Sequence, residues 1–119
     1  MATYKADLTL TSTNLTSDNM SVAASITNTS ANYGGVVKQL LKSATNVALF
    51  DKDAYSEGAI VYIMNADSAG TVTVSITAAE EIVLGAGEWA AFPWGDRTTD
   101  IHVKTDQADG RAIEWGVFN

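Results

Sequence analysis

The sequence has 119 residues, the size of a typical single domain, and a chain of this length can bury a sizeable core without covalent cross-links. The absence of cysteine excludes a disulfide framework, a thiolate nucleophile and a cysteine-ligated zinc site. The formal net charge of −7 argues against a nucleic-acid or anionic-membrane partner, because both need clustered lysine and arginine side chains.

Alternation of apolar and polar residues predicts β-strands along most of the chain. Near the N-terminus, Leu8 and Leu10 share one face of a predicted strand, and Thr9 and Thr11 share the other. A period of two with many β-branched residues is typical of half-buried strands. The segments with this pattern are residues 6–13, 21–27, 71–77, 100–106 and 112–118. Many short strands separated by turn residues predict one all-β domain over residues 1–119, an antiparallel sandwich or a barrel.

The segment "VVKQLLKSATNVALF", residues 36–50, also fits a helical stripe of apolar positions between 36 and 48. Thr45, Asn46 and Val47 are poor helix formers. We therefore predict two strands here, at about residues 36–42 and 46–50, with a helix as the alternative.

The segment "AIVYIMN", residues 59–65, departs from alternation because it is apolar on both faces. Ile60, Tyr62 and Met64 share one face, and Val61 and Ile63 share the other. The outer face of an antiparallel sandwich normally meets water. This strand therefore needs a cover on its outer face, from a loop of the same chain, from a second subunit or from a ligand.

The stretch "GEWAAFPWGDR", residues 87–97, follows the glycine-containing turn "LGAGE". Glycines permit a positive φ in such turns, so residues 81–84 and 88–92 are predicted to form a hairpin. Pro93 cannot donate to a ladder, so the second strand either ends there or lies at a sheet edge. Trp94 is then expected in the loop beyond the strand.

Three roles are open for the aromatic residues of this stretch. Trp89 or Phe92 can belong to the core while Trp94 caps one end of the sandwich. Alternatively, one of them contacts a neighbouring subunit, as aromatic residues often do. A third possibility is that Trp94, with Asp96 and Arg97 nearby, stacks against a sugar.

The titratable residues form no catalytic or metal-binding motif. Asp51, Asp53 and Glu57 resemble the start of a calcium loop, but the EF-hand pattern fails because Ser56 stands in place of glycine and Tyr62 in place of glutamate. We therefore expect no metal site, no bound cofactor and no catalytic residue, and we do not expect an enzyme.

Three further titratable side chains were candidates for acid–base chemistry. Glu80 and Glu81 are adjacent, so in a strand they point to opposite faces and cannot act as a carboxylate pair. His102, the single histidine, falls on the polar face of its predicted strand.

Four short motifs occur in the span from Val61 to the C-terminus. They are "YIMN" at residues 62–65, "VTVSI" at 72–76, "LGAGEWAAFP" at 84–93 and "EWGVF" at 114–118. In these motifs the chain resembles small all-β virion proteins of tailed bacteriophages. The first half of the chain shares with those proteins only its general β-rich character.

The resemblance implies a jelly-roll-like β-sandwich that decorates or cements a phage capsid, commonly as a homotrimer. The implied partners are further copies of the chain and the major capsid protein, and the implied location is the capsid surface of a virion assembled in the host cytoplasm. The alternative is a tail or fibre module that binds host carbohydrate through Trp94 and its neighbours. The candidate interface residues are Tyr62, Met64, Trp89, Phe92, Trp94 and Phe118.

Overall fold

A computed structural model describes residues 2–13, 20–30, 35–55, 59–77, 80–94 and 99–118. The chain divides into two compact units, Met1–Asn32 and Tyr33–Asn119, and each is described by itself. Whether the two units fold as the one domain expected over residues 1–119 stays a prediction.

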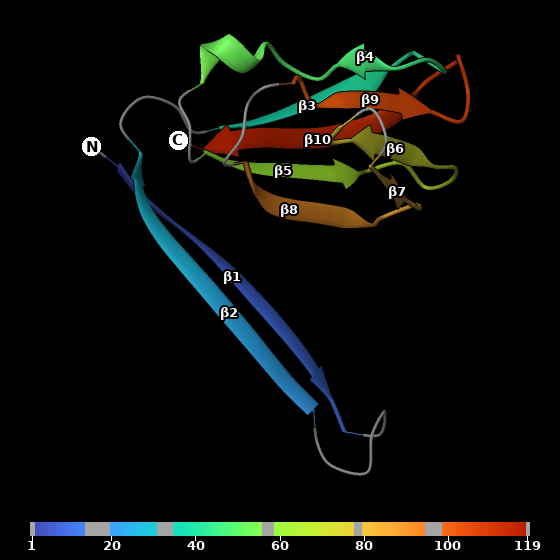
Figure 1. Cartoon of the computed structure of the whole chain (residues 1–119). Helices are drawn as coiled ribbons and strands as arrows, with labels where there is room; N and C mark the ends of the chain where they lie inside the picture. Colours follow the sequence, from blue (N-terminus) through green and yellow to red (C-terminus); the bar gives the residue numbers. More distant parts are fainter. Residues whose placement is uncertain are drawn as a thin grey trace. The chain divides into compact units, whose positions relative to one another are not determined.

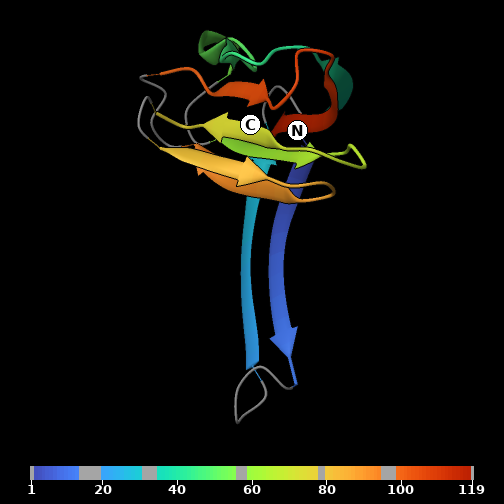
Figure 2. The ribbon, with the colours of Figure 1, turned by 90° about the vertical axis from the view of Figure 1, so that its right-hand side faces the viewer.

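The first unit is a long β-hairpin. Strands β1 (Ala2–Ser12) and β2 (Met20–Ser30) pair antiparallel over their whole length. Figures 1 and 2 show the two strands side by side in both views. The strands predicted at residues 6–13 and 21–27 are therefore confirmed, with β1 beginning earlier and ending one residue before Thr13, and β2 longer at both ends.

The second unit is an antiparallel β-sandwich, which confirms the predicted all-β class. Its strands are β3 (Val36–Leu41), β4 (Val47–Ala48), β5 (Ala59–Asn65), β6 (Val72–Ser75), β7 (Glu81–Leu84), β8 (Trp89–Trp94), β9 (His102–Thr105) and β10 (Arg111–Phe118). The first sheet has the order β3-β10-β5-β8, and the second sheet has the order β4-β9-β6-β7 (Figure 1). A short 3₁₀ helix, η1 (Lys52–Ala54), follows β4.

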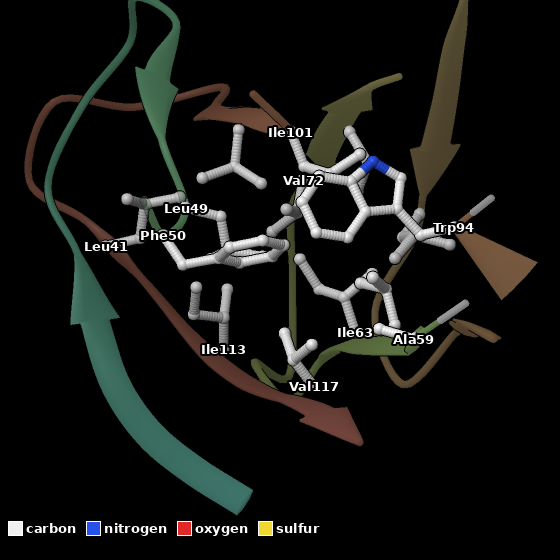
Figure 3. Close-up of a cluster of buried hydrophobic side chains, with 14 residues drawn as sticks. Leu41, Leu49, Phe50, Ala59, Ile63, Val72, Trp94, Ile101, Ile113 and Val117 are labelled. Carbon is white, nitrogen blue, oxygen red and sulfur yellow. The ribbon is translucent and has the colours of Figure 1, made fainter. Parts of the chain in front are cut away.

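The core of the sandwich unit lies between the two sheets. Val61 and Ile63 of the first sheet and Val72 and Val74 of the second are fully buried. Figure 3 shows the ring of Phe50 among side chains from both sheets. The same ring packs edge-on against two aromatic rings, those of Tyr55 and Trp94, each at a centroid distance of 5.2 Å. It also stacks on Trp115 at 5.8 Å.

The ambiguous segment after Gly35 forms the two predicted strands, so the helical alternative is wrong. Strand β3 pairs with β10, from Val36 opposite Gly116 to Leu41 opposite Arg111. Strand β4 pairs with β9 in the other sheet. The apolar residues that imitate a helical stripe therefore lie on two strands in different sheets.

The predicted hairpin between residues 81–84 and 88–92 is wrong. Strand β7 pairs with β6 in the second sheet, whereas β8 pairs with β5 in the first. The turn between them is held at this corner by Asn65, whose carbonyl accepts the N–H of Gly87 at 2.9 Å and whose N–H donates to the carbonyl of Glu88 at 2.9 Å. These bonds to a third strand direct the chain from one sheet to the other.

The position predicted for Trp94, in a loop beyond the strand, is also wrong. Trp94 is the last residue of β8, pairs with Ala59 and is only 3% exposed. Strand β8 is an edge strand, as the position of Pro93 allowed, so the missing N–H of proline need not interrupt its pairing with β5. The strand continues through Pro93 and places the indole in the core.

Asn65 is a polar residue with no exposed surface at the end of β5. Its side-chain amide donates to the carbonyls of Gly70 at 3.2 Å and Leu84 at 3.1 Å. Its side-chain oxygen accepts the N–H of Asp67 at 3.1 Å. One side chain therefore connects β5, the turn before β6 and the end of β7.

Candidate interaction surface

The register of the first sheet decides which of its residues point away from the core. Directly opposed residues of antiparallel strands point to the same face. The residues that share the outward face with Tyr62 are Val36, Lys38, Leu40, Ile60, Met64, Trp89, Ala91, Pro93, Ala112, Glu114, Gly116 and Phe118. We call this set the outer face of the first sheet, and only two of its members carry a charge.

The edges of this outer face are the most exposed. On β3, Val36 is 52% and Leu40 is 54% exposed, and on β8 Trp89 is 54% exposed. The side chains of Tyr62 and Met64 on the central strand are half-buried. Val36 and Leu40 lie at one edge of the sheet and Trp89 at the other, with half-buried side chains between them, so this face is a candidate interaction surface.

A hydrogen-bonded group of polar residues lies in the middle of the outer face. The hydroxyl of Tyr62 donates to Glu114 Oε1 at 3.1 Å, and Lys38 Nζ lies 3.5 Å from Glu114 Oε2. Burial raises the pKa of Tyr62, and the neighbouring carboxylate of Glu114 raises it further. The charge of Glu114 is therefore satisfied within the face, and the apolar residues around it remain available to a partner.

The structure brings four of the six candidate interface residues onto this face. Tyr62, Met64 and Phe118 are half-buried there, and Trp89 is exposed. Two others have inward positions. Phe92 lies opposite Val61 and packs against the core, and Trp94 is part of the core itself.

Sequence reasoning missed two contributions to the exposed apolar surface. Val36 and Leu40 were read as ordinary strand residues, although their spacing of two from Lys38 places all three side chains on one face of the strand. In the first unit Leu8, Leu10, Val22 and Ile26 are between 40% and 51% exposed. Alternation identifies the shared face of such residues, but it does not tell whether anything covers that face.

Two acidic side chains near η1 accept hydrogen bonds from backbone N–H groups. Asp51 Oδ1 accepts the N–H of Asp53 at 2.9 Å and caps the short helix, and Asp100 accepts the N–H of Lys52 at 3.1 Å. Glu57 and Ser56 lie outside the described residues. Within the part of the chain that the structure describes, no three His, Cys, Asp or Glu side chains are grouped so that they could hold a metal ion.

The other titratable candidates lie on the second sheet or at its edge. His102 is half-buried, with Nδ1 3.0 Å from the carbonyl oxygen of Asp100. Glu81 lies 3.4 Å from both Lys104 Nζ and the hydroxyl of Ser75. Glu80 contributes its carbonyl oxygen to the N–H of Ile76. The contacts of Glu81 connect β7 with β6 and β9, whereas those of His102 and Glu80 are local.

Arg111 forms the most enclosed ion-pair group among the described residues, with a side chain that is 13% exposed. Its Nε lies 2.9 Å from Asp106 Oδ1, and its Nη1 lies 3.7 Å from Asp67 Oδ1. The guanidinium covers Gly70, where a Cβ would lie 2.2 Å from Arg111 Nε. The hydrogen bond from Arg111 lowers the pKa of Asp106, and the N–H of Ala112 contributes most to lowering the pKa of Asp67.

These lowered pKa values predict a loss of stability in acid. The folded-state pKa of Asp106 lies below its ordinary value of 3.8, so the unfolded chain binds a proton first. The stabilisation is complete above about pH 5, where the carboxyl is ionised in both states, and it is lost as the pH falls through the unfolded-state value and then the folded-state value. In urea titrations at several pH values, wild-type stability should fall more steeply below about pH 5 than that of Asp106→Asn. Equal slopes would show that the pair contributes nothing to acid sensitivity.

Trp94 cannot be the aromatic side chain on which a sugar stacks. Both faces of the Trp94 indole are enclosed by the core, so no ligand can stack on it. Asp96 and Arg97 lie outside the described residues. The exposed indole of this stretch is that of Trp89, at the edge of the first sheet.

Comparisons with known proteins add no relative. No family model, no curated protein and no solved structure matches the chain. Among the described residues, no helix has the length and apolar character needed to cross a membrane.

Proposed function

We propose that the protein is a phage decoration protein, which binds the outer surface of an assembled capsid as a homotrimer and stabilises the mature shell. The observation that carries the proposal is the outer face of the first sheet, where Val36, Leu40 and Trp89 are more than half exposed beside half-buried aromatic residues. The motif resemblance to small virion proteins supports the same assignment. A decoration protein needs such a surface and no active site.

The physics of multivalent binding suits this role. A trimer engages three equivalent sites of a lattice, and the second and third contacts are effectively intramolecular, so weak single contacts add to a strong attachment. Because the protein binds the assembled lattice and not its separated subunits, it stabilises that lattice by mass action. The net charge of −7 favours a position facing solvent over one facing packaged nucleic acid.

We also propose that the sandwich is a jelly roll. The orders β3-β10-β5-β8 and β4-β9-β6-β7 support this, because the chain passes repeatedly between the two sheets. Jelly rolls have eight strands in two sheets and occur in viral capsid and lectin domains. This architecture is compatible with both the decoration role and the carbohydrate-binding alternative.

The alternative function is a tail or fibre module that binds host carbohydrate. The exposed indole of Trp89 is the observation that favours it, because an exposed aromatic ring can stack on a sugar. Titration with host-surface glycans should then change tryptophan fluorescence in the wild type and not in Trp89→Phe. A decoration protein shows no such change.

The test of the decoration role uses purified protein and undecorated capsids. Trp89→Asp should lower the affinity for capsids by about 30-fold, which corresponds to about 2 kcal/mol for an aromatic side chain that anchors an interface. The matched control is Val83→Asp, because Val83 on the second sheet is 58% exposed and should not touch the shell. Co-sedimentation measures binding, and the temperature at which the shells rupture measures stabilisation.

Two results would contradict the proposal. The first is a failure of the wild-type protein to co-sediment with capsids, in which case the carbohydrate-binding function takes first place. The second is rupture of decorated and bare shells at the same temperature. Equal losses from Trp89→Asp and Val83→Asp would show that the outer face of the first sheet is not the attachment surface.

A further inference from the structure

The hairpin of the first unit has one apolar and one polar face. The register places each residue of β1 opposite one of β2, and opposed residues share a face. The apolar face contains Ala6, Leu8, Leu10, Val22, Ala24 and Ile26. The other face contains Lys5, Asp7, Thr9, Thr11, Ser21, Ala23, Ser25 and Thr27. We call the first set the hairpin's apolar face.

This apolar face is not covered by any other described part of the hairpin unit. Its four large side chains are each 40% to 51% exposed. An isolated two-stranded hairpin is marginally stable in water, and its strands need further apolar contacts to be stable. Strands of eleven residues would therefore fray unless another surface covers this face.

The charge distribution of the hairpin restricts the partner. The apolar face carries no charged residue among those whose side chains are described, and the Lys5–Asp7 ion pair of 3.0 Å lies on the opposite face. A nucleic acid, an anionic membrane or a charged peptide would find no complementary group there. The partner must present an uncharged apolar surface of matching length, and every further copy of the chain presents one.

The sizes of the side chains also match a second copy. In the three cross-strand pairs whose side chains are described on this face, Ala6 lies opposite Ile26, Leu8 opposite Ala24, and Leu10 opposite Val22. In the first of these pairs the large residue is on β2, and in the second it is on β1. Side chains of two layers interdigitate best where large residues face small ones.

We propose that the hairpin's apolar face packs against the hairpins of other copies, about an axis parallel to the strands. Such an axis sets β1 of one copy against β2 of its neighbour, and each cross-strand pair then lies at the same height as the same pair of the neighbour. Leu8 then contacts the neighbour's alanine at position 24, and Ile26 contacts the alanine at position 6. An axis across the strands would instead set β1 against β1 and β2 against β2, and with the axis at the Leu8–Ala24 pair, Leu8 would meet Leu8 and Ala24 would meet Ala24.

The size of the ribbon limits the area that hairpins of different copies can bury. An eleven-residue strand is about 35 Å long and two paired strands are about 10 Å wide, so each copy offers a face of about 350 Å². A pair would bury about 700 Å² and three copies about 1,000 Å² shared among three contacts, and both lie below the roughly 1,600 Å² of a standard interface between two partners. The contact between hairpins is therefore small in a pair and in a trimer alike. The inference concerns self-association alone, so it stands whether or not the protein attaches to a capsid.

Disulfide trapping in the full-length protein tests the register. The chain contains no cysteine, so Leu8→Cys and Ala24→Cys each introduce a single thiol. After the two variants are mixed, exchanged and oxidised, a disulfide-linked pair of chains should form, because positions 8 and 24 meet between copies. Neither variant should cross-link efficiently alone. Absence of the mixed pair, or efficient cross-linking of Leu8→Cys with itself, would overturn the proposed packing.

A charge substitution tests the same surface without a cross-link. Leu10→Asp should reduce the molar mass in solution to the 12.6 kDa of a single chain. The matched control Thr9→Asp adds the same charge one residue away, on the polar face, and should leave the assembly intact. Circular dichroism of both variants shows whether the sandwich is folded. If both variants keep the wild-type mass, the copies associate through another surface and the proposal fails.

Discussion

Replacing Trp94 by alanine should lower the free energy of unfolding by about 3–5 kcal/mol, the range found when a large aromatic side chain is removed from a core. The indole is 3% exposed and packs edge-on against Phe50 at 5.2 Å. Its removal leaves a cavity between the sheets that the rigid strands around it cannot fill. Urea unfolding of the full chain, followed by circular dichroism, measures the change.

The control for this prediction is Trp89→Ala on the same strand. Trp89 is 54% exposed, so its removal from the isolated chain should cost less than about 1 kcal/mol. The two tryptophans thus separate stability from binding, because Trp89 belongs to the proposed attachment surface. Similar losses of stability in both variants would contradict the placement of Trp94 in the core and Trp89 on the surface.

Replacing Asn65 by alanine should destabilise the protein by about 3 kcal/mol, because several buried groups lose their partner together. The carbonyls of Gly70 and Leu84 and the N–H of Asp67 all bond to this side chain. The main-chain bonds of residue 65 to Gly87 and Glu88 remain in the variant, so at the corner between β7 and β8 only the side-chain bond to Leu84 is lost. Thermal unfolding by calorimetry should show a fall in Tm of more than about 10 °C for this domain size.

An exposed asparagine provides the comparison. Asn46→Ala removes the same amide at an exposed position, so its effect should stay within about 0.5 kcal/mol. If Asn65→Ala were equally mild, water would be replacing the lost bonds, and the hydrogen-bonded corner would not be the element that holds β5, β6 and β7 together.

The strands were the most predictable part of the fold. Alternation in residues 71–77 and 100–106 follows directly from burial on one side, so it is visible without any knowledge of partners. The connection after β7 was not predictable in this way. A four-residue glycine turn suits a hairpin or a passage between sheets equally well, and the choice depends on Asn65, which is distant in sequence.

The candidate surface was predictable only in part. The pattern of residues 59–65 correctly marked a strand, β5, whereas the need of its outer face for a cover stays a prediction. The inward turn of Trp94 was missed because proline was taken to end the strand, whereas an edge strand tolerates it. The exposure of Leu40 and Val36 depends on their pairing with β10, which no local pattern reveals.

We propose that the exposed apolar faces of the chain are covered by other protein surfaces, first of all by further copies of the chain. The molar mass of the purified protein in solution tests this proposal. Light scattering at micromolar concentration should give three times the single-chain mass of 12.6 kDa. A mass of 12.6 kDa, unchanged as the protein is concentrated, would contradict the account.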